Sequence, residues 1–290
     1  MMPLLLAVDL LEPLRQGFVI QVLILAGLIG VVCAVLSCYL VLKGWALMGD
    51  AISHAVLPGI ILAYVLGIPL TIGAFASGML CAVGTGWIKA RSRIKEDTVM
   101  GIVFTGLFAL GLILMSRVAS DVHFDQIIRG SLLGIHKSDM IQVYITSAVT
   151  LGVVLLKRKD LMLLCFDQAQ AKSVGLNTTF LYYLLLTLLA ATTVAALQAV
   201  GIILTVAMLI TPGSIAFMWT SRFDRMLLIA SSTAVVAAVV GTYISYFFDG
   251  SAAGFIVLMQ SLFFIITIVF APKHGLIARR RTLKAALDQI

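Results

Sequence analysis

Charged side chains are scarce in this chain of 290 residues. Asp, Glu, Lys and Arg make up only 11% of it, whereas 61% of the residues are hydrophobic and the mean hydropathy is +1.12. A soluble globular domain carries about 25% charged residues, so the composition excludes that class and predicts a polytopic membrane protein. The excess of Lys and Arg over Asp and Glu, 20 against 13, is what the positive-inside rule produces in such a chain, and it is not evidence for a nucleic-acid partner.

Several signatures of catalytic and secreted proteins are also missing. The four cysteines form no CxxC pair, which argues against a zinc knuckle or a disulfide framework. An intramembrane metalloenzyme needs a general base and at least three protein ligands to zinc, and no HExxH or similar pairing occurs. No GxxxxGK[ST] phosphate loop occurs either, so any ATP must be hydrolysed by another chain. Asp9, Glu12 and Arg15 interrupt the apolar start, so no removable signal peptide is expected.

Uncharged stretches long enough to cross a bilayer, which takes about 20 apolar residues, recur along the chain. The uncharged run 173–221 is too long for one span and is divided at 198–201, and Thr211-Pro212-Gly213 is expected to kink or break its second piece. The fold class is therefore an all-α polytopic membrane protein with eight to nine transmembrane helices. The expected spans are 16–42, 46–66, 70–88, 98–116, 140–156, 178–197, 201–219, 226–248 and 251–271.

The whole chain, residues 1–290, is expected to form a single transmembrane domain. Residues 1–15 are interpreted as an amphipathic lead-in, 117–139 as a short surface or re-entrant helix, and 273–290 as a basic cytoplasmic tail on anionic lipid. Placing the tail and the loops at 43, 89–95, 157–172 and 222–225 in the cytoplasm leaves only four of the 20 Lys and Arg on the other side. This asymmetry predicts an outside N-terminus and an inside C-terminus.

Asp50 and His54 lie at the start of a stretch, Ala51 to Ile88, that holds no Asp, Glu, Lys or Arg. A charged group at mid-bilayer costs roughly 2.5–3.5 kcal/mol, so a sequence that keeps one there has a use for it. Residues i and i+4 share a helix face, with Ser53 beside them, and Pro58 deprives the His54 carbonyl of its helical partner. A carboxylate with an imidazole suits a divalent first-row metal. The alternative is that Asp50 caps a helix at the interface and His54 is a core histidine.

Residues 160–176 form a second candidate segment, on the cytoplasmic side by charge counting. Small residues followed by Gly175 predict a short helix that ends in a glycine cap. Such a helix between two spans can lie in the groove of a cytoplasmic partner. An ordinary interfacial loop is the alternative.

Three segments resemble the ABC-3 permeases for zinc, manganese and iron. The stretch Gly49–Gly59 is similar to the second-helix signature of that family, and Ala199–Pro212 is similar to its late-helix motif. The stretch Phe166–Leu176 resembles the cytoplasmic coupling segment of bacterial ABC-importer permeases. The resemblance extends from about residue 14 to 275. It departs from the family pattern at Gly213-Ser214, after Thr-Pro, and at Arg129-Gly130, after the outer loop.

The resemblance implies a permease subunit with the fold of type II importers in the bacterial cytoplasmic (inner) membrane. Its partners would be a second permease subunit, a cytoplasmic ATP-binding subunit, an extracytoplasmic metal-binding protein and the lipid bilayer, with no nucleic acid. No permanently bound cofactor is expected, because the metal would be the transported cargo. Manganese or iron is favoured as that cargo over zinc. Asp50 and His54 match the metal-contacting positions. The residues that would couple the chain to the ATPase are Phe166, Asp167, Ala169, Ala171 and Gly175.

Two questions stay open from the sequence. The outer residues Asp121, His123 and Asp125 are candidates for a metal-entry funnel or a docking site for the binding protein, or they form a solvated loop. The other open reading of the function is a proton-coupled secondary metal carrier that works alone. It would need its own proton relay, and few intramembrane acids are present to supply one.

Overall fold

The structure is a computed structural model that describes residues 17–45, 47–118, 137–248, 250–272 and 275. This part of the chain is helical and contains no strand. Its helices are α2 (Gly17–Lys43), α3 (Met48–Ala55), α4 (Leu57–Leu66), α5 (Leu70–Arg91), α6 (Glu96–Arg117), α8 (Lys137–Leu156), α9 (Arg158–Phe166), α10 (Gln168–Ser173), α11 (Thr178–Val200), α12 (Ile202–Trp219), α13 (Phe223–Phe247) and α14 (Ala252–Phe270).

The described residues hold nine segments long and apolar enough to cross a membrane, with α3 and α4 counted together as Met48–Leu66. This confirms the predicted all-α fold with eight to nine spans. The division of the long uncharged run is also confirmed, because α11 and α12 are separated only by Gly201. That residue has φ 82°, a conformation that glycine adopts without a steric penalty. The predictions for residues 1–15, for most of 117–139 and for nearly all of the tail 273–290 lie outside the described residues.

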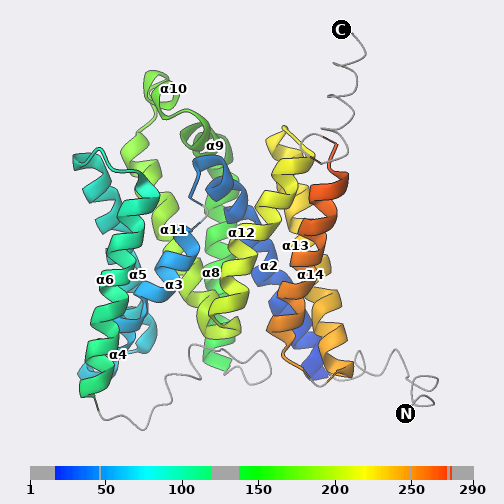
Figure 1. Ribbon diagram of the computed structural model, residues 1–290, viewed down its shortest axis with the longest axis horizontal. Coiled ribbons are helices and arrows are strands. Elements are labelled where there is room, and N and C mark those ends of the chain that lie inside the picture. Colours follow the sequence, from blue (N-terminus) through cyan, green and yellow to red (C-terminus); the bar gives the residue numbers. More distant parts are fainter. Residues whose placement is uncertain (1–16, 46, 119–136, 249, 273–274, 276–290) are drawn as a thin grey trace, which may run out of the picture.

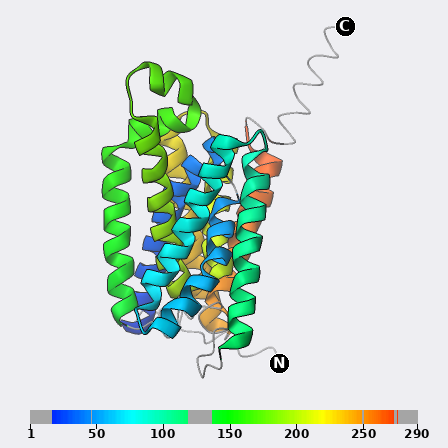
Figure 2. The same ribbon diagram turned by 90° about the vertical axis from the view of Figure 1, so that its left-hand side faces the viewer.

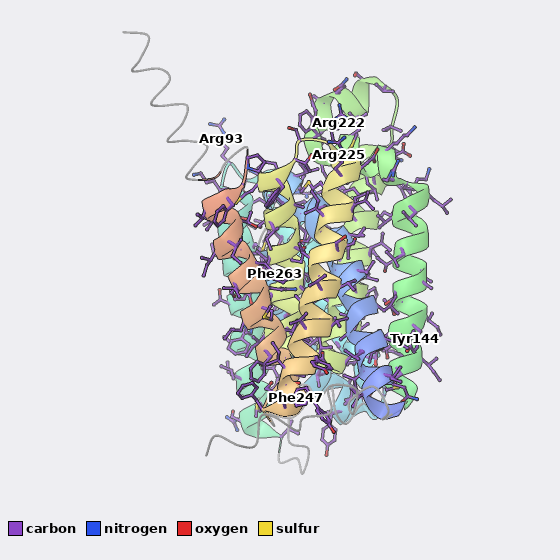
Figure 3. The ribbon with its side chains drawn as sticks, turned by 90° about the vertical axis from the view of Figure 1, so that its right-hand side faces the viewer. Arg93, Tyr144, Arg222, Arg225, Phe247 and Phe263 are labelled. Atoms are coloured by element: carbon purple, nitrogen blue, oxygen red, sulfur yellow. The ribbon has the colours of Figure 1, made fainter. Side chains whose placement is uncertain are left out.

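Successive spans run in alternating directions between two ends (Figure 1). We call the end that carries α9 and α10 the α10 end, and the opposite one the α4 end. Figure 2 shows α10 standing beyond the ends of the spans. Arg93, Arg222 and Arg225 lie at the α10 end, whereas Phe247 lies at the α4 end (Figure 3). The described basic loops are thus gathered at one end, as charge counting predicted.

Small residues let the helices approach closely, as is common between membrane spans. A Cβ atom on Gly59 would overlap the carbonyl oxygen of Gly73, and the reverse holds for Gly73, so α4 and α5 cross there in backbone contact. Gly241 meets the backbone of Ile256 in the same way, where α13 crosses α14. The contact surface of α13 also carries fully buried alanines, Ala230, Ala234, Ala237 and Ala238.

The second span is broken in its middle. α3 ends at Ala55, Val56 links the two pieces, and α4 begins at Leu57 with Pro58 in its first turn. A proline costs nothing at a helix start because its missing N–H would have no partner there. Across the break, the Ser77 hydroxyl on α5 donates a hydrogen bond to the Ala55 carbonyl.

The other proline-containing span is continuous. Pro212 was predicted to kink or break its helix, and it does not break it, since α12 runs from Ile202 to Trp219. Beside the proline, the buried Ser37 hydroxyl on α2 accepts a hydrogen bond from the Gly213 N–H at 3.0 Å and donates to the Ile210 carbonyl at 3.2 Å. Neighbouring serines are one means by which membrane helices tolerate proline.

Candidate functional site

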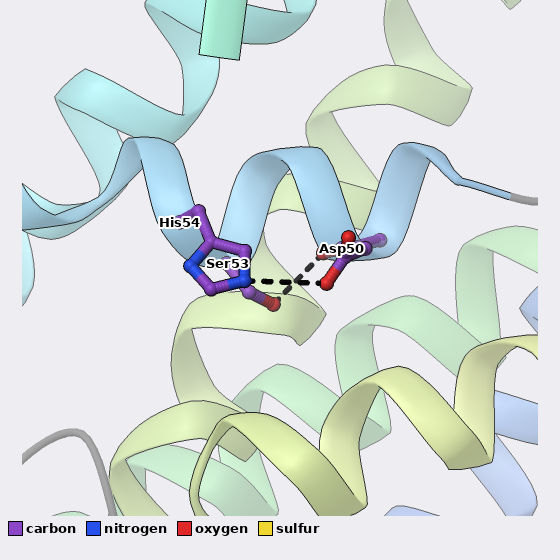
Figure 4. Close-up of polar contacts among 4 residues, drawn as sticks. Asp50, Ser53 and His54 are labelled. Carbon is purple, nitrogen blue, oxygen red and sulfur yellow. Dashed lines mark hydrogen bonds and ion pairs between the residues drawn. The ribbon is translucent and has the colours of Figure 1, made fainter. Parts of the chain in front are cut away.

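Asp50 and His54 lie on one side of α3, with the Asp50 Oδ1 and His54 Nε2 atoms 3.4 Å apart (Figure 4). The helical i, i+4 spacing produces this proximity, as predicted. Both side chains are about one third exposed, whereas most of the remaining residues of α3 are buried. The short helix therefore presents its only two ionisable groups toward the same open space.

The structure does not favour the reading of Asp50 as a cap at the membrane interface. α3 lies near half height between the two ends of the bundle (Figure 1). No side chain caps its N-terminus, where Leu47 occupies the N-cap position. Asp50 is in the first turn of α3, where the positive end of the helix dipole stabilises a carboxylate.

Two aromatic rings from α6 flank the histidine. Phe104 stacks on the His54 ring with centroids 6.2 Å apart, and Phe108 meets it edge-on at 5.4 Å. Phe108 also lines a small cavity of about 120 Å³ beside His54. The walls of this cavity are otherwise mainly aliphatic and include Leu57, Ile60, Leu197 and Ile202.

The separation of the two polar atoms suits a shared ion. Two ligands at about 2.1 Å from a metal lie roughly 3.0 Å apart in octahedral geometry and roughly 3.4 Å apart in tetrahedral geometry. The 3.4 Å between Asp50 Oδ1 and His54 Nε2 falls at the upper end of this range. No group of three or more His, Cys, Asp or Glu able to hold a metal occurs among the described residues. This part of the chain thus brings together two groups of the kind that ligate divalent metals.

The Ser53 hydroxyl forms a hydrogen bond within its own helix. It lines the same cavity as His54, but its side chain is buried and its hydroxyl donates to the Gly49 carbonyl at 2.8 Å. Its proton is therefore committed to its own helix, and only oxygen lone pairs remain to face the cavity.

The predicted short helix near the cytoplasmic side is present as α10. The Asp167 carboxylate accepts hydrogen bonds from the N–H groups of Ala169 and Gln170 at 2.9 and 3.0 Å, and so caps the start of the helix. Gly175 follows the end of the helix with φ 86°. The Gly175 and Leu176 N–H groups bond back to the carbonyls of residues 172 and 171, the pattern of a Schellman end.

Exposure divides the residues predicted for coupling into two groups. Phe166, the last residue of α9, is 78% exposed. Asp167, Ala169 and Gly175 are exposed as well. Ala171 is fully buried and seats α10 on the rest of the molecule, so it offers no surface to a partner.

Two residues beside His54 could not be assigned to the site from the sequence. Phe104 and Phe108 have helical spacing, but aromatic residues at that spacing usually just pack in a core, and nothing in the sequence pairs α6 with α3. The outer residues Asp121, His123 and Asp125, predicted as a funnel or docking site, lie outside the described residues.

Comparison with known proteins gives a consistent result. The chain is 52% identical over 270 residues to the manganese transport system membrane protein MntB of Synechocystis sp., covering 93% of this chain and 88% of that one. It is 57% identical over 259 residues to the chelated iron transport system membrane protein YfeD of Yersinia pestis, covering 89% and 87%. Its fold matches PsaBC from Streptococcus pneumoniae with a TM-score of 0.82 at 37% identity, over 95% of this chain and 99% of that one. The family model described as ABC 3 transport family matches residues 15–271, so the chain belongs to that family.

Proposed function

We propose that this chain is the membrane-spanning permease subunit of an ATP-driven importer, and that it conducts manganese or iron into a bacterial cytoplasm across the inner membrane, with zinc as the alternative cargo. Family membership and the relatives named for manganese and chelated iron transport support this assignment. Carboxylate and imidazole ligands suit such metals but do not choose among them.

The observation that carries the proposal is the Asp50–His54 pair on the broken second span. A transported ion must be bound well enough to enter and loosely enough to leave, so a site on the pathway should offer few ligands. The pair offers two, with a separation suited to one ion. A second permease subunit, identical or paralogous, would face this pair across a two-fold axis and double the set.

Replacement of Asp50 by Asn and of His54 by Ala tests the site. Asn keeps the size of Asp50 but removes the charge that offsets the dication, and Ala removes the nitrogen ligand. Both variants should assemble with their ATPase yet lose most uptake of radioactive Mn²⁺ and Fe²⁺ into reconstituted vesicles, normalised to assembled complex. Asp97→Asn is the matched control, because Asp97 is an exposed carboxylate in the first turn of α6.

Uptake at the wild-type rate in both site variants would remove Asp50 and His54 from the pathway. Poor assembly with normal uptake per assembled complex would assign them a structural role instead. Uptake that persists in vesicles without any ATP-binding subunit, driven by a proton gradient, would favour a stand-alone carrier. An extracytoplasmic metal-binding protein would deliver the ion at the α4 end.

The same proposal assigns α10 to the cytoplasmic side and residues 160–176 to contact with the ATP-binding subunit. The exposed Phe166 and the protruding short helix support this assignment, since a large apolar side chain is left for a partner to cover. Asp167 and Gly175 hold the two ends of α10 in shape, and Ala171 holds its inner face.

These roles decide which substitutions test coupling cleanly. Asp167→Arg or a bulky residue at Gly175 would also unfold an end of α10, so Phe166→Ala and Ala169→Arg are preferred. We expect both variants to insert normally and bind metal, while stimulation of ATP hydrolysis falls by about tenfold or more, the size of a loss of one interface anchor. Phe180→Ala is the control, because Phe180 is also exposed, at 57%, but lies outside the segment. Normal stimulation in both variants would place the ATPase contact elsewhere.

A further inference from the structure

A second polar site lies at the α10 end, away from Asp50 and His54. It is a cavity of about 330 Å³ into which five elements project. α2 and α5 end at it, α6 and α11 begin at it, and α10 contributes Gln168. Its lining residues are Lys43, Gly86, Lys89, Ala90, Glu96, Gln168, Thr179, Tyr182 and Tyr183.

The charges in this cavity do not neutralise one another. Lys43, Lys89 and Glu96 all line it, yet no ion pair joins either lysine to the glutamate within this described region. Lys89 donates one hydrogen bond to the Ile94 carbonyl at 2.8 Å, which leaves two of its three donors. The ammonium of Lys43 lies 5.8 Å from the centre of the Trp45 ring. Two cations and one carboxylate thus share a space large enough to keep them apart.

A hydrogen bond from Tyr182 positions the Glu96 carboxylate without occupying both of its oxygen atoms. The Tyr182 hydroxyl donates to Glu96 Oε1 at 3.3 Å, which leaves Glu96 Oε2 as a free acceptor. A tyrosine hydroxyl that donates can still accept one hydrogen bond. Gly86 makes this arrangement possible, because a Cβ atom there would lie 2.6 Å from the Tyr182 hydroxyl oxygen.

The cavity lies at the ends of membrane-spanning helices. Beside it, Trp87 and Ile94 are exposed on the outer surface, and the guanidinium of Arg91 stacks over the Trp87 ring at 4.2 Å. Tryptophan and basic residues mark the membrane–water interface. All but one of the lining residues belong to membrane-spanning helices, and only Gln168 comes from α10. The cavity therefore fits a ligand from the membrane better than one from a soluble partner.

We propose that this cavity binds a phosphate ester that carries a primary ammonium, namely the ethanolamine headgroup of an aminophospholipid in the adjoining leaflet. The phosphate lies between the ammonium groups of Lys43 and Lys89, as in other basic pockets between membrane helices. The ligand ammonium donates to Glu96 Oε2 and to the Tyr182 hydroxyl. A purely anionic headgroup would meet the uncompensated carboxylate, and a choline headgroup has no N–H to donate.

This ligand would tie α10 to the spans. Lys43, Lys89, Glu96 and Tyr182 stand on four different helices, and Gln168 is the first residue of α10. A headgroup bound to all of them holds the inner ends of α2, α5, α6 and α11 around the base of the short helix. The binding itself does not depend on the proposed transport function, because it involves neither Asp50 nor His54.

The test uses the full-length chain, purified in detergent and depleted of lipid. Its unfolding temperature is measured with added dioleoyl phosphatidylethanolamine, phosphatidylcholine or phosphatidylglycerol, and separately with soluble O-phosphoethanolamine. We expect phosphatidylethanolamine to raise the unfolding temperature by about 5 °C near saturation and the other two lipids to raise it by about half as much or less. An equal effect of all three lipids would overturn the proposal.

Substitutions test which residues bind the phosphate of the headgroup and which bind its ammonium. Glu96→Gln should abolish the advantage of phosphatidylethanolamine over phosphatidylcholine, and Lys43→Gln with Lys89→Gln should reduce the response to every phospholipid. Lys95→Gln and Asp97→Asn are the controls, because both residues are exposed nearby but do not line the cavity. Each variant is first compared with the wild type without lipid, so that loss of folding is distinguished from loss of binding.

The remaining measurements distinguish a lipid headgroup from a soluble phosphate ester as the ligand. Stabilisation by O-phosphoethanolamine that matches the lipid and is lost in Glu96→Gln supports the site chemistry and assigns a soluble ligand. Stabilisation by the lipid alone assigns the membrane source. An unchanged lipid preference in Glu96→Gln overturns the proposal. Acylation of Lys43 and Lys89 gives a second test. If a purified ATP-binding subunit protects these lysines and phosphatidylethanolamine does not, the cavity binds a protein partner and the proposal is overturned.

Discussion

Two of the described membrane spans contain proline. One of them is divided into two helices, and the other is a single continuous helix. At Pro58 the second span is divided into α3 and α4, whereas α12 continues through Pro212. At the first break, Ser77 satisfies only the Ala55 carbonyl. At the second proline, Ser37 satisfies both the Gly213 N–H and the Ile210 carbonyl. The continuous helix is thus the one that makes two hydrogen bonds to a neighbouring hydroxyl.

The difference separates a structural proline from one that shapes a site. The break between α3 and α4 leaves α3 as a short helix with Asp50 and His54 on one open side. Around Pro212 the helix surface is buried against α2, and its polar groups are used for packing. The interruption in the second span is confined to Val56, which keeps helical φ and ψ angles and lines the small cavity beside His54.

The largest expected effect concerns the crossing that supports the broken span. Gly59→Ala adds a methyl group where the Gly73 carbonyl oxygen already lies, so α4 and α5 must separate. We expect a loss of about 4 kcal/mol or more, which is the class of severe core overpacking. The measurements are the yield of monodisperse protein after detergent extraction and its unfolding temperature.

The matched control for this prediction is on α5 itself. Gly84→Ala places a methyl group 3.8 Å from the nearest atom, the Val103 Cγ1, which is an ordinary contact. That variant should fold like the wild type. If Gly59→Ala also gave wild-type yield and unfolding temperature, α4 and α5 would not be in backbone contact.

A smaller effect is expected at Ser37. Ser37→Ala removes the acceptor that α2 offers to the buried Gly213 N–H, at a cost of about 1–3 kcal/mol. Ser77→Ala should cost less, because only a carbonyl loses its partner and unsatisfied carbonyls are better tolerated. Thermal unfolding of the two variants gives the comparison, with Ser232→Ala as the control, since that exposed hydroxyl bonds only to its own helix. Equal losses for Ser37→Ala and Ser77→Ala would remove the distinction between the two prolines.

The sequence predicts the spans well because the bilayer imposes a local rule. Stretches without charge end at residues such as Lys43 or at turns such as Gly67-Ile68-Pro69, and the helices end within a few residues of those points. The Asp50–His54 pair is predictable for the same reason, since its contact follows from i, i+4 spacing within one helix. The two caps of α10 are local as well, so a short helix could be expected there.

The features that the sequence did not predict depend on residues far apart in the chain. The hydroxyl that bonds to α12 beside Pro212 belongs to Ser37, on another span, and no local pattern connects the two. The rings that flank His54 come from α6, at Phe104 and Phe108. Helix periodicity predicts that a residue faces a neighbour but does not say which helix the neighbour belongs to. The departure noted at Gly213 is explained by the same contact, because a side chain there would overlap Ser37.

The smallest effect is expected for Pro212→Ala. The new N–H can bond to the carbonyl four residues earlier in α12, which stabilises the helix by about 0.5–1.5 kcal/mol. The lost ring carbons were buried, and each costs about 0.8 kcal/mol. These opposing terms nearly cancel, and Ser37 still holds Gly213, so the unfolding temperature and metal uptake per assembled complex should both stay close to the wild-type values.

Pro58→Ala is the contrasting variant. It should fold equally well, but the restored N–H allows α3 and α4 to join and turns Asp50 and His54 from their open side, so uptake should fall severalfold. Equal uptake in the two variants would show that the break at Pro58 does not shape the metal site.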